Sequence, residues 1–334
     1  MNFFYLALSS PYNFQIKEKN KIIMNLKEEI RKMCHEKNAL IMAHYYTEGE
    51  IQEVADFVGD SLALAQKAKE TDASIIVMCG VHFMGETSKI LCPDKKVLIP
   101  DANATCSLAE SCPADKFEEF VNAHPGHTVI SYVNTTAATK AVTDVVVTSS
   151  NAVQIVESFP KDTPIIFGPD ENLGSYINSI TGRNMLLWNG ACHVHERFSL
   201  EKILQLKSEH PEAKILAHPE CKGPILRVAD KIGSTAALLK FSISDSAEEF
   251  IVATESGIIH EMQKSCPNKK FIPAPPSDST CACNECNYMK MITIEKLYDC
   301  LKNEYPEIQV DAALAKKAIV PIEKMLEISS KIAL

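Results

Sequence analysis

The sequence has no excess of basic residues and no long apolar run. The first absence argues against a nucleic-acid-binding protein, and the second against a protein that spans a membrane. Its 334 residues carry a formal net charge of -9, with no block of like charge. A nucleic-acid interface needs a basic face, so we expect no nucleic-acid partner. No apolar run approaches the ~20 residues that a membrane span needs, so we expect no membrane partner either.

A secretion signal is also lacking. The short apolar stretch from Phe3 to Leu8 has no positive charge before it and no small-residue cleavage site after it. Further on, Asn25 can cap a helix and Glu28 completes a capping box, so we expect residues 1–24 to be an extension before the first helix. We expect a cytoplasmic protein, and in that reducing compartment its 12 cysteines indicate metal binding or catalysis rather than disulfides.

What the chain does contain is an internal repeat. Residues 92–100 (CPDKKVLIP) and residues 266–273 (CPNKKFIP) are nearly the same. Their starts are 174 residues apart, twice a period of 87, which predicts a third copy midway. Residues 180–188 at that place again read as a turn, a basic residue and a short apolar strand.

Three further sequence features recur with the same period. Each repeat has an apolar strand with a polar or aromatic end, a hydroxyl residue 17 positions later, and a cysteine near its own end. In chain order these residues are His44, Ser61 and Cys106; Tyr132, Ser149 and Cys192; and His218, Thr235 and one of Cys281, Cys283 or Cys286. Three like modules can direct three like loops toward one central point.

Short apolar runs alternate with helix-length periodic segments in every repeat. Strands are expected at residues 40–43, 74–78, 97–99, 128–133, 145–148, 164–167, 185–188, 214–217, 250–254 and 270–273, and helices at 50–57, 61–69 and 82–91, while 235–241 fits either a strand or a helix end. This alternation predicts the α/β class, with parallel-sheet domains at 25–112, 113–198 and 199–300 and a C-terminal helical segment at 301–334. Linkers are expected at 122–127 and 198–213, and the proline-rich loop 274–279 is expected to lie over the shared centre.

Polar side chains stand at the ends of these strands. They are His44, Tyr132, Asn134 and His218. Parallel α/β sheets bind ligands at the carboxyl ends of their strands. The hydroxyl residue of each repeat stands where a helix begins, and the amides of a helix N-terminus bind phosphate and carboxylate groups. An ordinary helix cap explains any one of these hydroxyls, but three in register indicate anion binding.

The cysteines indicate a metal. Three of them within six residues, Cys281, Cys283 and Cys286, suit zinc or an iron–sulfur cluster, but no fourth zinc ligand lies at finger spacing. One cysteine from each repeat can instead hold three irons of a 4Fe-4S cluster and leave the fourth iron open as a Lewis acid, which indicates non-redox catalysis. The cysteines expected to be small core residues are Cys34, Cys79, Cys92, Cys221, Cys266 and Cys300.

Several short motifs together resemble the quinolinate synthase (NadA) family, over nearly the whole chain from about Asn25. They are AHYY at 43–46, GDS at 59–61, YVN at 132–134, TSS at 148–150, Cys192 with VHERF at 194–198, HPEC at 218–221, GST at 233–235 and CNYMK at 286–290. The resemblance implies three pseudo-symmetric repeats of a parallel-sheet α/β domain around a central 4Fe-4S cluster. It also implies a transferase of NAD biosynthesis that condenses iminoaspartate with dihydroxyacetone phosphate to quinolinate, with loss of phosphate and water. A functional link to the enzyme that supplies iminoaspartate would follow.

The same resemblance implies the site residues. The cluster ligands fall on Cys106, Cys192 and Cys286, with one iron left open. Substrate contacts fall on His44, Tyr46, Ser61, Tyr132, Asn134, Ser149, His218, Glu220 and Thr235, of which Tyr46, His218 and Glu220 would move protons. The repeat period alone would select Cys281, but the Cys-x-x-Met-Lys context selects Cys286. We follow the context, because loop insertions shift spacing more easily than the surroundings of a ligand change. His193 and His195 flank Cys192 and are expected to support it.

Two other functions compete with this interpretation. A non-catalytic iron–sulfur redox sensor or cluster carrier would account for the cysteines, but not for the ordered polar residues in all three repeats. A zinc hydrolase that uses His44 and His218 would lack a local zinc motif.

Overall fold

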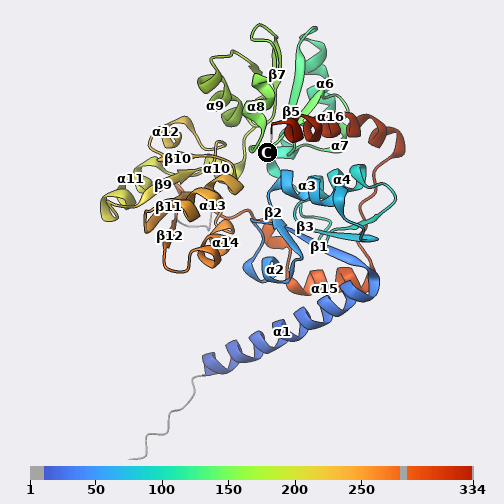
Figure 1. Cartoon of the computed structure of the whole chain (residues 1–334), viewed down its shortest axis with the longest axis vertical. Coiled ribbons are helices and arrows are strands. Elements are labelled where there is room, and N and C mark those ends of the chain that lie inside the picture. Colours follow the sequence, from blue (N-terminus) through green and yellow to red (C-terminus); the bar gives the residue numbers. More distant parts are fainter. Residues whose placement is uncertain (1–10, 279–283, 333–334) are drawn as a thin grey trace, which may run out of the picture.

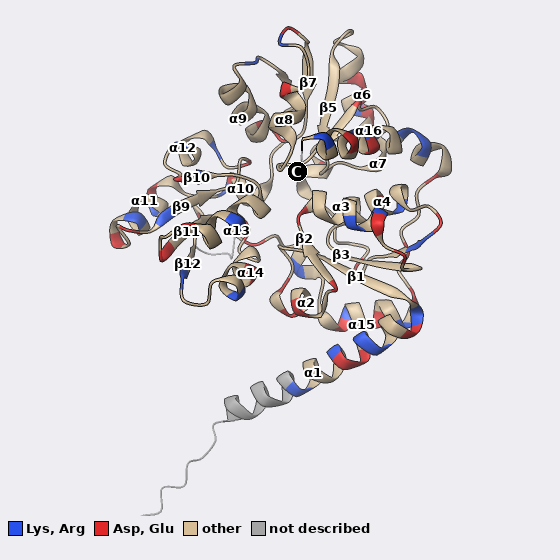
Figure 2. Cartoon of the chain, in the orientation of Figure 1, with Lys and Arg blue, Asp and Glu red and all other residues tan. Residues whose placement is uncertain are grey.

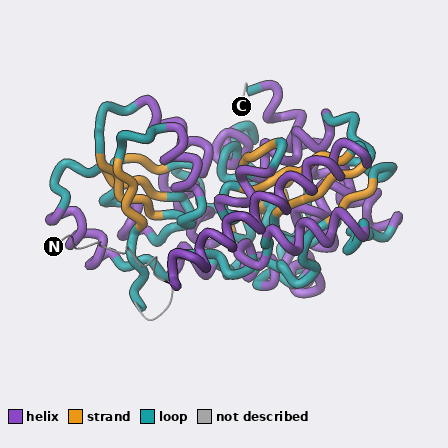
Figure 3. Tube along the Cα trace, turned by 90° about the horizontal axis from the view of Figure 1, so that it is seen from below, coloured by secondary structure: helices purple, strands orange, loops and turns teal. Residues whose placement is uncertain are grey.

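Three parallel sheets form the fold, one from each repeat of the sequence. The structure is a computed structural model that describes residues 11–278 and 284–332. Figure 1 shows the three sheets with their helices as three lobes around a common centre. In the turned view of Figure 3 the strands lie inside, and helices and loops lie around them.

The helices and strands of the three repeats follow one another in the same pattern. The first repeat contains β1 (Ala39–His44), α2 (Gly49–Val54), β2 (Phe57–Gly59), α3 (Ser61–Glu70), β3 (Ile75–Cys79), α4 (His82–Leu91), β4 (Lys96–Leu98) and α5 (Ser107–Glu110). The second contains α6 (Ala114–Asn122), β5 (Thr128–Tyr132), α7 (Ala137–Lys140), β6 (Val145–Val147), α8 (Ala152–Glu157), β7 (Ile165–Phe167), α9 (Glu171–Thr181), β8 (Leu186–Leu187) and α10 (His193–Glu196). The third contains α11 (Leu200–Glu209), β9 (Lys214–Ala217), α12 (Gly223–Leu226), β10 (Lys231–Ile232), α13 (Thr235–Ser244), β11 (Glu249–Ala253), α14 (Ile258–Ser265) and β12 (Lys270–Pro273).

The three sheets have the same topology. Their strand orders are β2-β1-β3-β4, β6-β5-β7-β8 and β10-β9-β11-β12, and all neighbouring strands are parallel. This confirms the predicted class of three parallel-sheet α/β repeats. Because strands within a parallel sheet run the same way, the carboxyl ends of each sheet lie along one edge.

An aspartate stands before the second strand of each sheet, at intervals close to the period of 87 residues. The carboxylates of Asp56, Asp144 and Asp230 accept the backbone N–H of the first strand at 2.8, 2.8 and 2.7 Å. Each of these aspartates also donates its own N–H to the carbonyl of the residue that it accepts from, at 2.9, 2.9 and 2.8 Å. This reciprocal pair joins the first two strands at their amino-terminal side in every repeat.

The basic residue of the repeated turn also has one task in all three repeats. Lys95, Arg183 and Lys269 each donate to backbone carbonyls near the C-terminal end of the helix before the third strand (α3, α8 and α13), on Thr71, Phe159 and Ser242 among others. Cations are favourable at that end of a helix. The sequence marks that indicated the repeat therefore correspond to repeated hydrogen bonds.

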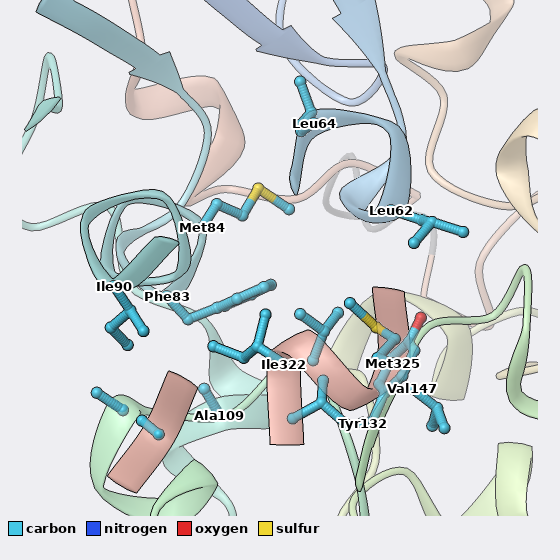
Figure 4. Packing of buried hydrophobic residues seen from close by; sticks show 14 of the residues in the cluster. Leu62, Leu64, Phe83, Met84, Ile90, Ala109, Tyr132, Val147, Ile322 and Met325 are labelled. Atoms are coloured by element: carbon cyan, nitrogen blue, oxygen red, sulfur yellow. The ribbon is translucent and has the colours of Figure 1, made fainter. Parts of the chain in front are cut away.

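The terminal helices extend over the first two repeats. They are α1 (Pro11–Lys37), the short helix η1 (Met289–Met291), α15 (Ile294–Asn303) and α16 (Ala312–Lys331). Ile30 of α1 and Leu297 of α15 are buried in one cluster with residues of the first sheet. In Figure 4, Ile322 and Met325 of α16 pack between Phe83 of α4 and Tyr132 of the second repeat. The C-terminal segment therefore joins the first repeat to the second.

Several sequence expectations need correction. Asn25 lies inside α1, which begins at Pro11, so it caps no helix; proline is a favoured first residue of a helix. The expected linker 198–213 contains the helix α11. The short strands β2 and β10 were not predicted, because β2 begins inside the expected helix 50–57 and β10 contains a single apolar residue. Residues 235–241 belong to α13.

Charge is mixed over the outer surface. Figure 2 shows basic and acidic residues interspersed along α1, α15 and α16. Among the described residues, no helix combines the length and apolar character that crossing a bilayer requires.

Candidate active site and metal centre

A cavity lies at the centre of the molecule, between the three repeats. Its lining includes every residue that the sequence had indicated for the site: His44, Tyr46, Ser61, Cys106, Tyr132, Asn134, Ser149, Cys192, His218, Glu220, Thr235 and Cys286. The rest of the lining is Asp60, Val81, Phe83, Met84, Thr148, Val194, His195, Glu255 and Met289. Phe83, Met84 and Tyr132 also belong to the large hydrophobic cluster of Figure 4, so one wall of the cavity is the surface of that core.

The strand ends place the polar residues in this cavity. His44 and Tyr132 are the last residues of β1 and β5, and His218 follows β9 directly. The residues two positions further on, Tyr46, Asn134 and Glu220, line the cavity as well. Each repeat therefore supplies a pair of side chains from the end of its first strand, and the three pairs differ in chemistry.

The hydroxyl residues come from the turns before helices. Ser61 and Thr235 are the first residues of α3 and α13, whose caps are the side chains of Asp60 and Ser234. Ser149 lies in the turn before α8. The N-termini of α3 and α13 carry partial positive charge, so the cavity can attract anionic groups at these two points.

Two histidines have the same tautomer. The backbone N–H of Tyr46 donates to Nδ1 of His44 at 3.2 Å, and the N–H of Glu220 donates to Nδ1 of His218 at 3.4 Å. Burial lowers the pKa of both rings to about 3, although the negative charge of Glu220 opposes the shift. Each ring is therefore neutral at pH 7, with its proton on Nε2, and can donate a hydrogen bond from that atom.

Glu220 is a buried carboxylate with several donors around it. Tyr132 donates its hydroxyl to Oε1 at 2.7 Å, and Nδ1 of His195 lies 3.1 Å from Oε2. Burial tends to raise the pKa of Glu220, but His195, His218 and the hydrogen bond from Tyr132 outweigh it and lower the pKa to about 2. Glu220 is therefore ionised at neutral pH.

A line of close polar contacts leads from Glu220 to the other side of the cavity. Its first step, Nδ1 of His195 to Oε2 of Glu220 at 3.1 Å, lacks hydrogen-bond geometry, and the later steps are hydrogen bonds. Nε2 of His195 lies 3.0 Å from Oγ1 of Thr254, which lies 2.8 Å from the hydroxyl of Tyr46. The Tyr46 hydroxyl also lies 2.7 Å from Oγ1 of Thr235. Burial raises the pKa of Tyr46 well above its usual value, so its hydroxyl stays protonated. This line of contacts can pass protons between side chains of all three repeats.

The thiols of Cys106, Cys192 and Cys286 face one another across this site. Burial raises the pKa of Cys106 to about 12 and that of Cys286 to about 11, and it raises the pKa of Cys192 well above its usual value. Neighbouring thiols add to the shifts of Cys106 and Cys192. Thiols that ionise with such difficulty become thiolate ligands when a metal cation compensates for their charge.

A donor set for a metal is also present within this group. One ligand atom each from Cys192, His195 and Glu220 lie within 4.8 Å of one another, so these three residues could hold a metal ion. Cys281 and Cys283 lie outside the described residues. The six cysteines predicted to be core residues are all buried.

Some site features did not follow from the sequence. Glu255 lines the cavity and is fully buried, and burial raises its pKa to about 7 against the effect of Lys290. The sequence repeat gave no sign of Glu255, because the corresponding positions of the other two repeats carry Val81 and Pro169. His195, expected only to support Cys192, lines the cavity itself.

The proline-rich loop does not lie where it was expected. In its described part, the carbonyl of Pro275 accepts the N–H of Ser199, and the carbonyl of Pro276 accepts Nζ of Lys202 at 2.9 Å. None of residues 274–278 lines the cavity. This part of the loop therefore packs on the start of α11, because its carbonyls find donors there.

Comparison with known proteins identifies the family of the chain. The family described as Quinolinate synthetase A protein matches residues 28–327. The quinolinate synthase of Trichodesmium erythraeum is 56% identical over 310 residues, which cover 93% of this chain and 96% of that protein. Those of Chloroherpeton thalassium and Nostoc punctiforme are 55% and 54% identical, over 92% and 98% of this chain and 95% and 99% of their own lengths. By its sequence over nearly its whole length, the chain belongs to the quinolinate synthase family.

Proposed function

We propose that this protein is a quinolinate synthase that condenses iminoaspartate with dihydroxyacetone phosphate to quinolinate, with loss of phosphate and water. The observation that carries the proposal is the single cavity in which three thiols and the polar strand ends of all three repeats meet. A cluster carrier or redox sensor would need the thiols alone. The family of the chain supports the same activity.

The cofactor in this proposal is one 4Fe-4S cluster held by Cys106, Cys192 and Cys286. When bound, it would supply an iron without a protein ligand, which can act as a Lewis acid toward a substrate oxygen or nitrogen. The chemistry of the donor set supports this choice, because three partly buried thiols with raised pKa values need a cationic group to become ligands. A single ion on Cys192, His195 and Glu220 is the alternative, but it would compete with the contacts that His195 and Glu220 already make.

The substrates in this proposal are anions, yet the described lining contains no lysine or arginine. Neutral donors would therefore hold their carboxylate and phosphate groups. Ser61, Ser149, Thr235 and the Nε2–H of His44 are such donors, and the N-termini of α3 and α13 add partial charge. The buried Oδ1 of Asn134 has no hydrogen-bond partner among the described residues, which supports the proposal that a ligand binds at this place.

Proton transfer is assigned to Tyr46, His218 and Glu220. Tyr46 is a protonated phenol, His218 a neutral imidazole and Glu220 a carboxylate at neutral pH. The condensation needs groups that both donate and accept protons, and this set contains both kinds. The line of contacts through His195 and Thr254 would let Tyr46 and Glu220 exchange a proton after each turn of the reaction.

We place the enzyme in the cytoplasm, where all ten cysteines of the described residues can remain free thiols, as they are in the structure. Imines hydrolyse in water, so a functional link to the enzyme that supplies iminoaspartate would limit the loss of this substrate.

Anaerobic purification followed by turnover tests the proposal. We expect a brown protein with about four irons and four sulfides per chain, which forms quinolinate when both substrates are supplied. A protein with the cluster but no turnover would support the sensor or carrier instead. A protein with one zinc or one iron and no sulfide would support the single-ion site and overturn the cofactor assignment.

A further inference from the structure

Two buried carboxylates hold the backbone of two of the three cysteines in the cavity. Cys192 donates its N–H to Oδ2 of Asp170 at 2.9 Å, and Cys286 donates its N–H to Oε1 of Glu255 at 3.0 Å. Both acids are fully buried. Asp170 lies 22 residues before its cysteine and Glu255 lies 31 residues before its own, so both contacts are tertiary.

We propose that Asp170 and Glu255 are positioning residues that hold Cys192 and Cys286 in place for the metal cluster. The inference rests on the proposed cluster and adds residues that do not themselves bind it. Both acids come from the loop after the third strand of their sheet, β7 for Asp170 and β11 for Glu255. The rigid sheets would thus fix the position of each cysteine through one side chain.

Each acid uses both of its oxygens on backbone N–H groups. The second oxygen of Asp170 accepts the N–H of Leu173 at 2.9 Å and so caps α9. The second oxygen of Glu255 accepts the N–H of Gly257 at 2.7 Å. Only a carboxylate offers two acceptor oxygens in this geometry, because the corresponding amide would turn one acceptor into an NH₂ group that faces another N–H. These two hydrogen bonds therefore require the carboxylate, and an amide of the same shape could not accept both of them.

The rest of the backbone around each cysteine is held as well. The carbonyl of Cys192 accepts the N–H of Glu196 at 2.9 Å, and the carbonyl of Cys286 accepts the N–H of Lys290 at 3.0 Å. Nζ of Lys290 lies 3.2 Å from Oε1 of Glu255 and donates to the carbonyl of Tyr46 at 3.1 Å. Glu255 and Lys290 therefore also connect Cys286 to the first repeat.

The first repeat lacks this device. The residues after β3 are Gly80, Val81 and His82, none of which is an acid. There the loop that leads to Cys106 is held by the backbone, since the N–H of His82 donates to the carbonyl of Ala104 at 2.7 Å. The inference therefore concerns two ligands of the cluster and predicts an asymmetric dependence on carboxylates.

The isosteric variants Asp170→Asn and Glu255→Gln test the inference. Groups that orient metal ligands typically contribute 10–100-fold to metal affinity. We expect both variants to take up iron and sulfide under anaerobic reconstitution and then to lose iron to a chelator roughly 10–100-fold faster than the wild type. The electron paramagnetic resonance signal of the reduced cluster should change as well. The matched control is Asp144→Asn, which alters an amide acceptor of the same repeat at the far end of β5, and its iron loss should equal that of the wild type.

Thermal melting of the cluster-free proteins separates positioning from folding. The inference predicts that both cluster-free variants fold, with a melting temperature lowered only by the few degrees that one lost buried hydrogen bond causes. Wild-type iron loss and an unchanged signal in both variants would overturn it. Failure of both cluster-free variants to fold would also overturn it, because the acids would then serve the fold. If only one of the two variants folds, the rate at which that variant loses iron to the chelator tests the inference. A wild-type protein without any iron–sulfur centre would instead refute the proposed function.

Discussion

The two ends of the three sheets differ in how strictly they repeat. At the amino-terminal side, each second strand is preceded by the same residue in the same bond, Asp56, Asp144 and Asp230. At the carboxyl side, the first strands end in three different pairs: His44 with Tyr46, Tyr132 with Asn134, and His218 with Glu220. The amino-terminal side serves the sheet, whose geometry is the same three times. The carboxyl side serves one shared cavity, where three identical pairs would offer only one kind of chemistry.

Under the proposed function, the difference separates the residues that hold the fold from those that would take part in the reaction. A residue that is the same in all three repeats and makes the same hydrogen bond in each should contribute about equally to the free energy of unfolding in each repeat. A position that carries a different residue in each repeat should make a different contribution to the site in each. Substitutions at the two ends of the sheets should therefore differ in whether they change turnover or stability.

The largest effect is expected where the three repeats meet. Cys106→Ser, Cys192→Ser and Cys286→Ser should each abolish the iron–sulfur cluster and the turnover, because a cluster with three thiolates cannot lose one. Iron and sulfide analysis after anaerobic purification measures this. Cys281→Ser and Cys283→Ser are the matched controls and should keep both. Full iron in Cys286→Ser together with loss in Cys281→Ser would show that the repeat period selects the ligand.

The next effect concerns proton transfer at the carboxyl end of β9. His218→Ala and Glu220→Gln should keep the cluster and slow turnover by roughly 10²-fold or more, the usual contribution of an acid–base group. Asp230→Asn, at the opposite end of the same sheet, should leave turnover unchanged. Near-normal turnover in both site variants would remove these residues from the mechanism. Loss of iron in either would mean that it supports the cluster.

A smaller effect is expected on the pH dependence of stability. The pKa of His44 is about 3 in the folded protein, below its ordinary value of 6.5, because the ring is buried. Below pH 6.5 the unfolded chain therefore binds a proton that the folded protein does not, and stability falls as the pH falls toward 3. Relative to pH 7, His44 alone should cost about 2 kcal/mol at pH 5.

Urea unfolding of the cluster-free protein at pH 7 and pH 5 measures this difference. His44→Gln should reduce it, while His35→Gln, on the exposed surface of α1, should not. Equal differences in the wild type and in His44→Gln would mean that His44 is not buried as a neutral ring.

The smallest effect is expected at the amino-terminal side. Asp56→Ala, Asp144→Ala and Asp230→Ala should each lower the free energy of unfolding by about 1 kcal/mol, the usual net contribution of a hydrogen bond. Turnover should stay unchanged in all three. Urea unfolding and the quinolinate assay give both values. A loss of turnover in any one of them, or a large effect in only one repeat, would contradict the division between the two ends.

Much of this molecule could be predicted where the signal is local. The predicted helix at 82–91 is α4, and the longer strands were placed to within about two residues, because each contains enough apolar residues to show its period. The strand β2 overlaps the expected helix 50–57, the strand β10 has a single apolar residue, and α1 extends further toward the N-terminus than its expected cap. These misses lie at the limits of what local patterns can show.

That each sheet carries its site residues at one edge follows from the sequence alone. A period of 87 residues puts like residues at like places in three sheets, and parallel sheets collect them at one edge. Contacts between distant residues were decided only by the tertiary structure: the reach of Asp170 to Cys192, of Glu255 to Cys286, and of Tyr132 to Glu220. Such contacts depend on how the repeats pack against one another, and no spacing within a repeat records that packing. The kinds of residues in the site are thus a property of the sequence, while their hydrogen bonds and pKa values arise from the burial that the assembled repeats create.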